Sequence, residues 1–114
     1  ARLRMEAEAL EMTELRLLGD LARGRAPGAQ TSLVKLVAST MQQQVDELAL
    51  IAFGHDALQL PPERPLYGNA APEPIGSRSA QMAMPTYLNN RAWTIFGGSN
   101  EVQKTIIAKA VLGL

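Results

Sequence analysis

Apolar residues recur along this chain at steps of three, four and seven, which is the period of a helix with one buried face. The first stripe predicts a helix over residues 2–23, ended by Gly24 and Pro27–Gly28. The second predicts a helix that begins at Thr31 or Ser32 and ends at Gly54. No stretch alternates apolar and polar residues for long, so strands are not expected. The residues expected to face a core are Leu3, Ala7, Leu10, Leu17 and Leu21 in the first helix, and Val34, Val37, Met41, Val45, Leu48 and Ala52 in the second.

Two shorter helices are expected in the C-terminal part of the chain. Residues 59–77 hold five prolines and two glycines, a composition that predicts a long surface loop. A third helix is expected from Ser77 to Phe96, either kinked or begun at Pro85. Its apolar residues are Met82, Met84, Leu88, Ala92, Ile95 and Phe96.

The pair Gly97–Gly98 should break that helix and let a fourth begin. The fourth helix is expected from Ser99 or Asn100 to about Val111, with Asn100 and Gln103 at the spacing of a capping box. Its buried face would consist of Val102, Ile106, Ile107, Ala110 and Val111. Together the four helices predict an all-α antiparallel helical bundle over residues 1–114.

Charge and composition exclude several classes of function. Eleven Lys and Arg balance eleven Asp and Glu, so the chain lacks the basic excess of a nucleic-acid-binding module. The absence of cysteine and the presence of one histidine leave no Cys- or His-rich metal site and no thiolate nucleophile. That histidine, His55, follows a helix end and is interpreted as a cap or exposed residue rather than a base. No apolar run is long enough for a membrane span, and the chain begins at Ala1, so we expect a cytoplasmic piece of a longer protein.

The segment from Thr94 to Gln103 carries the most functional information. It combines a helix, a break of two glycines and a fresh helix N-terminus with small polar residues. Glycines without Cβ atoms let another molecule approach the main chain, and a helix N-terminus suits an anionic or carbonyl-rich ligand. An ordinary glycine-mediated corner between two packed helices is the commoner source of such a segment, because corners of this kind are frequent in bundles. Both interpretations stay open on these residues alone.

The same segment resembles the signature near the C-terminus of acyl-CoA dehydrogenases, flavoenzymes that desaturate acyl-CoA thioesters. In that family an aromatic residue precedes a variable residue, a glycine, a Thr or Ser and a polar stretch that ends in Gln, as in Phe96–Gln103 here. The Ile-Ile-Ala of 106–108 and the terminal Val-Leu-Gly-Leu are also typical of many members. The resemblance implies that residues 1–114 are the C-terminal helical bundle domain of a larger flavoprotein, lacking the first helix of that domain.

What the resemblance implies for function can be stated residue by residue. The cofactor is FAD, the substrate an acyl-CoA, and the electron acceptor an electron-transfer flavoprotein or similar protein. The assembly is a homo- or hetero-oligomer, typically a dimer of dimers. Trp93 would lie nearest the acyl or flavin face, and Ser99 and Glu101 would hydrogen-bond the FAD. The positions expected to contact FAD are Phe96, Gly97, Gly98, Ser99 and Glu101.

Two departures from the family pattern leave the activity open. Gly97 stands where several branches place the catalytic glutamate, and a glycine cannot abstract a proton. The base would then come from the helix preceding this segment or from a partner subunit, as in heteromeric sterol side-chain dehydrogenases. Leu50 and Phe53 stand where the family often has a glutamine and a glycine touching the neighbouring subunit's FAD. Three functions therefore remain: an active dehydrogenase, a non-catalytic assembly subunit paired with an active homologue, and an acyl-CoA oxidase. The acyl group, whether linear, branched or steroid, is not indicated.

Overall fold

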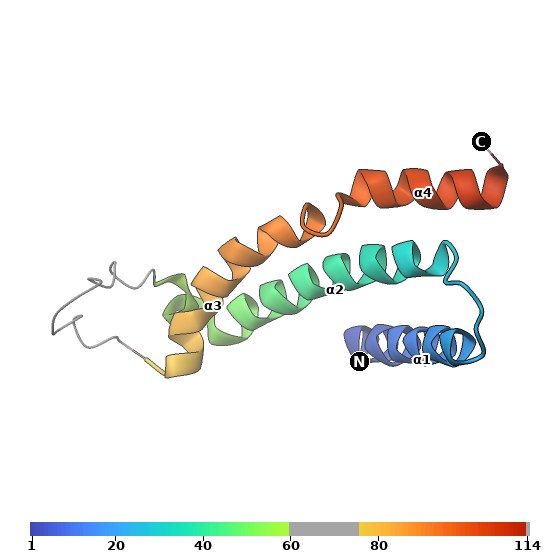
Figure 1. Ribbon diagram of the computed structural model, residues 1–114. Helices are drawn as coiled ribbons and strands as arrows, with labels where there is room; N and C mark the ends of the chain where they lie inside the picture. Colours follow the sequence, from blue (N-terminus) through green and yellow to red (C-terminus); the bar gives the residue numbers. More distant parts are fainter. Residues whose placement is uncertain (60–75, 114) are drawn as a thin grey trace, which may run out of the picture. The chain divides into compact units, whose positions relative to one another are not determined.

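The computed structural model describes residues 1–59 and 76–113, and this part of the chain is all-α (Figure 1). The expected fold class is therefore confirmed. The elements are the four α-helices α1 (Arg2–Ala22), α2 (Gln30–Phe53), α3 (Arg78–Asn90) and α4 (Asn100–Leu112), and the 3-10 helices η1 (Gly54–Leu58) and η2 (Arg91–Thr94). The expected proline-rich loop lies mostly outside the described residues. None of the described helices is long and apolar enough to cross a membrane.

The third helix is shorter than the sequence predicted. Its N-cap is Ser77, whose hydroxyl oxygen accepts a hydrogen bond from the backbone N–H three residues on, at 3.2 Å. Pro85 lies inside α3 rather than at its beginning. The α-helix ends at Asn90 and tightens into η2, so the expectation of one helix reaching Phe96 is wrong.

The start of the fourth helix also differs from the capping box that was expected. Ser99 is the N-cap, and its hydroxyl oxygen accepts from the Val102 N–H at 3.3 Å. The side chain of Asn100 is used elsewhere, in contacts with α2. Gln103 does not reach back to the N-cap; its Nε2 donates to the carbonyl oxygen of Gly97 at 3.2 Å. The assignment of Asn100 and Gln103 to a capping box is therefore wrong by one residue in register.

The chain divides into two compact units, Ala1–Gln42 with Ala92–Leu114, and Gln43–Arg91. The first unit holds α1, the first part of α2, and α4. The second unit holds the last part of α2, then η1 and α3. In the second unit Ala57 of η1 and Ala80 and Ala83 of α3 are buried.

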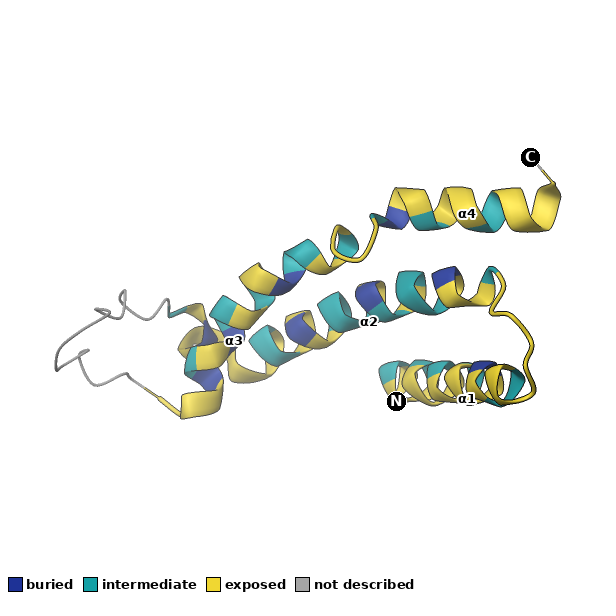
Figure 2. Ribbon diagram, viewed as in Figure 1, coloured by how far each residue is buried: buried dark blue, intermediate teal, exposed yellow. Residues whose placement is uncertain are grey.

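Apolar burial is slight in the described part of the chain (Figure 2). The buried apolar side chains there are Leu17, Ala57, Ala80 and Ala83, so the expectation that whole stripes are buried is wrong for this chain by itself. In α4, for example, Val102 and Ile106 keep 50% and 44% of their surface exposed. The large apolar residues of the predicted stripes that are exposed are Leu21, Val37, Val45, Leu48, Met82, Leu88, Ile95, Phe96, Val102, Ile106 and Val111. Wide apolar faces of this kind are typical of helices that pack on more neighbours than one chain supplies.

The buried positions of α2 are polar instead. Ser32, Ser39 and Asp46 follow one another at intervals of seven residues and are all buried. That spacing places them on one face of the helix. Buried polar groups need hydrogen-bond partners, and two of these three residues receive theirs from Asn100 and Asn90.

Candidate functional site

The corner between η2 and α4 has a backbone that requires glycine. Gly97 has φ +66° and Gly98 has φ +88°, both in the left-handed region that residues with a Cβ rarely adopt. Just before them, the N–H groups of Ile95 and Phe96 both donate to the carbonyl oxygen of Ala92 at 2.9 Å and close the preceding turn. Gly97 and Gly98 therefore separate α4 from the residues before it, although the helix that they were expected to break has already ended at Asn90.

The two glycines differ in what surrounds them. A Cβ atom built on Gly97 would meet no other atom within 4 Å, so the main chain there is open to approach. A Cβ on Gly98 would lie 2.7 Å from Nε2 of Gln103, so the carboxamide of that side chain covers Gly98. The side chain of Gln103 thus covers the main chain at Gly98 and leaves the main chain at Gly97 open. A second molecule can reach the main chain at Gly97.

Beside the corner, the first turn of α4 carries a carboxylate. Glu101 is exposed, and its own backbone N–H and then the hydroxyl of Ser99 lower its pKa from the ordinary value of 4.5 by hydrogen bonding. The cations of Lys104 and Lys35 lower the pKa further. Because Ser99 and Glu101 occupy N–H groups of this turn, the helix N-terminus offers an ionised acceptor rather than bare donors. Hydroxyl and amino donors fit it better than a phosphate.

The depressed pKa of Glu101 makes a prediction about pH. A carboxylate whose pKa is lower in the folded state stabilises that state above its unfolded pKa, and the stabilisation is lost as the pH falls through the folded pKa. At pH 7 we therefore expect Glu101→Gln to melt below the wild type. The difference in melting temperature should vanish as the pH drops below 4.5 and past the lowered pKa. Glu14→Gln, on the exposed side of α1, controls for losing any surface carboxylate. A difference that persisted at low pH would contradict the assignment.

Apolar surface flanks the corner. Phe96 is 61% exposed and Trp93 45% exposed, and the side chain of Ile95 is also exposed. Flat aromatic rings left open beside bare main chain are suited to stacking on or packing against a planar ligand. The residues expected to contact FAD and substrate are therefore brought together in one short segment of the first unit, from Trp93 to Glu101.

A polar cluster that the sequence did not predict joins α2 to the first residue of α4. Oδ1 of Asn100 accepts hydrogen bonds from Nζ of Lys35 at 2.7 Å and from Oγ of Ser39 at 3.0 Å. We name Lys35, Ser39 and Asn100 the Asn100 anchor. A signal that could have indicated it is the spacing of seven residues between Ser32 and Ser39, which are both buried in α2.

The second unit contains a separate polar cluster. Nδ2 of Asn90 donates to Oδ2 of the buried Asp46 at 2.9 Å. The Arg91 guanidinium lies over the ring of Tyr87, 4.1 Å from its centroid, and lies 3.5 Å from Oε1 of Glu47. These contacts join α3 and the start of η2 to the last part of α2.

The remaining positions singled out in the sequence lie in the second unit. Leu50 is half-buried and Phe53 is exposed at the end of α2. His55 is exposed in η1, one of the two surroundings expected for it. Within residues 1–59 and 76–113, no group of His, Asp or Glu is placed to hold a metal ion.

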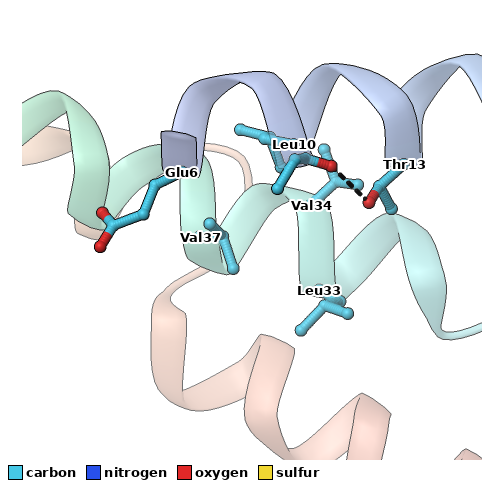
Figure 3. Close-up of a pocket in the computed structure, with 7 residues that line it drawn as sticks. Glu6, Leu10, Thr13, Leu33, Val34 and Val37 are labelled. Atoms are coloured by element: carbon cyan, nitrogen blue, oxygen red, sulfur yellow. Dashed lines mark hydrogen bonds between the residues drawn. The ribbon is translucent and has the colours of Figure 1, made fainter. Parts of the chain in front are cut away.

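The first unit also contains a shallow groove (Figure 3). Its volume is about 240 Å³, and it lies between α1 and the first part of α2. Its lining is mostly apolar, with Leu10, Leu33 and Val37 prominent and Glu6 as its one charged residue. The hydroxyl of Thr13 is directed back to the carbonyl oxygen of Ala9 at 2.9 Å. The groove is smaller than most ligand pockets and lacks converging polar groups, so it is not a cofactor site.

Comparison with known proteins agrees with the all-α fold class. The family model "Acyl-CoA dehydrogenase, C-terminal domain" matches residues 1–112. Acyl-CoA dehydrogenase IpdE1 of Mycolicibacterium smegmatis is 68% identical over 28 residues, which are 25% of this chain and 7% of that protein. No solved structure matches the chain. The chain therefore belongs to the acyl-CoA dehydrogenase family, through the C-terminal domain of that family.

Proposed function

We propose that this chain is the C-terminal domain of an FAD-dependent acyl-CoA dehydrogenase, an enzyme that desaturates an acyl-CoA thioester between its α and β carbons. Its part would be to contact the flavin cofactor and to form the oligomer interface. The observation that carries the proposal is the open main chain at Gly97, between the exposed ring of Phe96 and the ionised carboxylate of Glu101. Membership of the family supports the reaction class.

The residues of the corner fit a contact with FAD. Phe96 offers an apolar ring, Gly97 offers main chain without a Cβ, and Glu101 offers an acceptor for a hydroxyl or amino group. The carboxylate of Glu101 would repel a phosphate, so the fit is to a sugar, ribityl or ring portion of the cofactor rather than to its pyrophosphate. When bound, FAD supplies the hydride acceptor for the desaturation.

The proton from the α carbon must be taken by a residue outside the corner. Gly97 has no side chain, and the lowered pKa of Glu101 makes its carboxylate a weaker base than an ordinary glutamate. Glu101 is also occupied by its own N–H and by Ser99. In the proposed enzyme the base comes from a part of the protein outside residues 1–114 or from a partner subunit.

The test uses the full-length protein that carries this domain. After purification, the protein is expected to contain flavin with absorption near 450 nm that bleaches when acyl-CoA is added and recovers with an electron acceptor. Recovery with an electron-transfer flavoprotein but not with air would distinguish a dehydrogenase from an oxidase. A full-length protein that neither retains nor binds FAD would contradict the proposal.

A second function is favoured by the same departures from the family pattern. Gly97 lacks the side chain of a base, and Leu50 and Phe53 lack the polar or small groups expected at a cofactor contact with a neighbouring subunit. These features suit a non-catalytic subunit that assembles with an active homologue. Co-expression with such a homologue should then restore turnover that the protein lacks alone. Turnover by the purified homo-oligomer would exclude this second function.

The exposed apolar faces make a prediction about the 114-residue chain itself. Met5, Met12, Leu15 and Leu18 of α1 are all more than half exposed, which is unusual for a monomeric surface. We expect the isolated chain to self-associate as its concentration rises, measured by light scattering, and not to retain stoichiometric FAD. Leu15→Lys should shift the association to higher concentration, whereas Glu14→Lys, one residue away, should not. A strictly monomeric chain at high concentration would contradict this prediction.

A further inference from the structure

The buried residue of α4 is polar. Asn100, the first residue of that helix, is 8% exposed, whereas the apolar residues that follow it in the described part of α4 are half-buried or exposed. Burying a carboxamide costs free energy unless its polar atoms find partners. The partners found here come from a distant part of the sequence, Lys35 and Ser39 of α2. The start of α4 is thus held on α2 by hydrogen bonds rather than by apolar packing.

The Lys35 bond is the stronger part of the Asn100 anchor. Ser39 is 1% exposed, and its hydroxyl oxygen lies 3.0 Å both from Oδ1 of Asn100 and from the carbonyl oxygen of Leu36. A hydroxyl has one proton, so these two oxygens share it. Lys35 has three protons and a full charge, and its 2.7 Å distance to Oδ1 is that of a charge-assisted bond. Loss of the Lys35 bond would leave the buried Oδ1 of Asn100 with only the hydroxyl proton that Ser39 shares with Leu36.

The Asn100 anchor lies next to the corner at Gly97–Gly98 in the sequence. No atom lies within 4 Å of the place where a Cβ of residue 97 would be, and the carbonyl oxygen of Gly97 accepts a hydrogen bond from Nε2 of Gln103 at 3.2 Å. Two successive glycines in the left-handed region give this segment more conformational freedom than other residues would. Asn100 follows the corner by two residues and directly precedes Glu101. Holding Asn100 on α2 therefore fixes one end of the Gly97–Gly98 corner and the helix turn that carries Glu101.

We infer that Asn100, held by Lys35 and Ser39, is a positioning residue that aligns the Gly97–Gly98 main chain and Glu101 for contact with FAD. Asn100 itself makes no cofactor contact in this role; it acts through the residues on either side of it. The inference rests on the proposed function, because it assigns a role at the same corner. In this role the affinity for FAD depends on the hydrogen bonds of Asn100 to Lys35 and Ser39, which form away from the cofactor.

The experiment measures FAD binding by the full-length protein, reconstituted from its apoprotein, together with thermal unfolding. Asn100→Leu keeps the approximate size of the side chain and removes the acceptor, and it is expected to raise the Kd for FAD roughly tenfold. Asn100→Asp keeps an accepting oxygen toward Lys35 and Ser39 and is expected to stay within about threefold of the wild type. Asn89→Leu, at an exposed asparagine of α3, is the matched control and should leave the Kd unchanged.

The outcomes separate the inference from the proposed function. A wild-type protein that fails to bind FAD overturns the proposed function and, with it, this role. A wild type that binds FAD, with Asn100→Leu binding equally well, overturns the inference alone. A variant that melts lower but keeps the wild-type Kd also overturns it, because the anchor is then structural only. Should Asn100→Leu fail to fold, Ser39→Ala replaces it, with an expected rise of about threefold in Kd and no rise contradicting the role.

Discussion

Replacing Gly97 with alanine is expected to weaken FAD binding by the full-length protein about tenfold, while lowering the free energy of unfolding by about 1 kcal/mol. The stability cost arises because alanine is strained at φ +66°. The larger loss of affinity arises because the new methyl group enters the open space at the main chain, which we assign to the cofactor. Fluorescence titration with FAD measures the affinity, and urea unfolding measures the stability.

The chain supplies a matched control for this variant. Gly113, the C-cap of α4, has φ +71°, and a Cβ there would also meet no atom within 4 Å. Gly113→Ala therefore carries the same backbone strain away from the corner, and it should lower stability by a similar amount with no change in FAD affinity. Equal affinities for the two variants would show that the space at Gly97 is not used by the cofactor.

The helix boundaries could be predicted because their signals are local. The stop at Gly24, the break at Gly97–Gly98 and the polar starts of the helices all act within one turn of where they stand in the sequence. The third helix was predicted too long for the same reason. No local breaker marks Asn90, and α3 ends there as Asn90 engages Asp46, 44 residues earlier.

Burial was predicted less well than boundaries because it depends on neighbours. The period of three and four correctly identifies apolar faces such as that of Val102 and Ile106, but it does not say what covers them. In this chain by itself they stay largely exposed. Several of the buried positions are polar residues such as Ser39 and Asn100, which the apolar period does not indicate.

In the candidate site, too, the local features could be predicted from the sequence and the long-range contacts could not. The corner at Gly97 and Gly98 could be predicted because two adjacent glycines indicate a backbone conformation that other residues rarely adopt. The structure confirms that both have a left-handed φ. Asn100 was assigned to a cap because its spacing to Gln103 permits one. Its actual partners lie 61 and 65 residues away, so no spacing within the segment could indicate them. That a FAD molecule lies at this corner remains a prediction.

The second large effect is expected in the other unit, at Asn90. Asn90→Leu removes the amide that donates to the buried carboxylate of Asp46 at 2.9 Å. A hydrogen bond to a charged group contributes more than a neutral one, and the buried oxygen would also lose a donor without gaining contact with water. We expect the free energy of unfolding of the 114-residue chain to fall by about 2 kcal/mol. Urea unfolding at one fixed, low protein concentration measures the change as a shift in midpoint at constant slope.

Asn89→Leu is the control for this prediction, because it makes the same substitution one residue earlier at an exposed position. It should change the free energy of unfolding by less than about 0.5 kcal/mol. Combining Asn90→Leu with Asp46→Leu should cost less than the two single changes added together, since the double variant leaves no carboxylate without its amide. If the two asparagine variants unfold at the same urea concentration, or if the double change is additive, the Asp46–Asn90 bond does not stabilise α3 against the last part of α2.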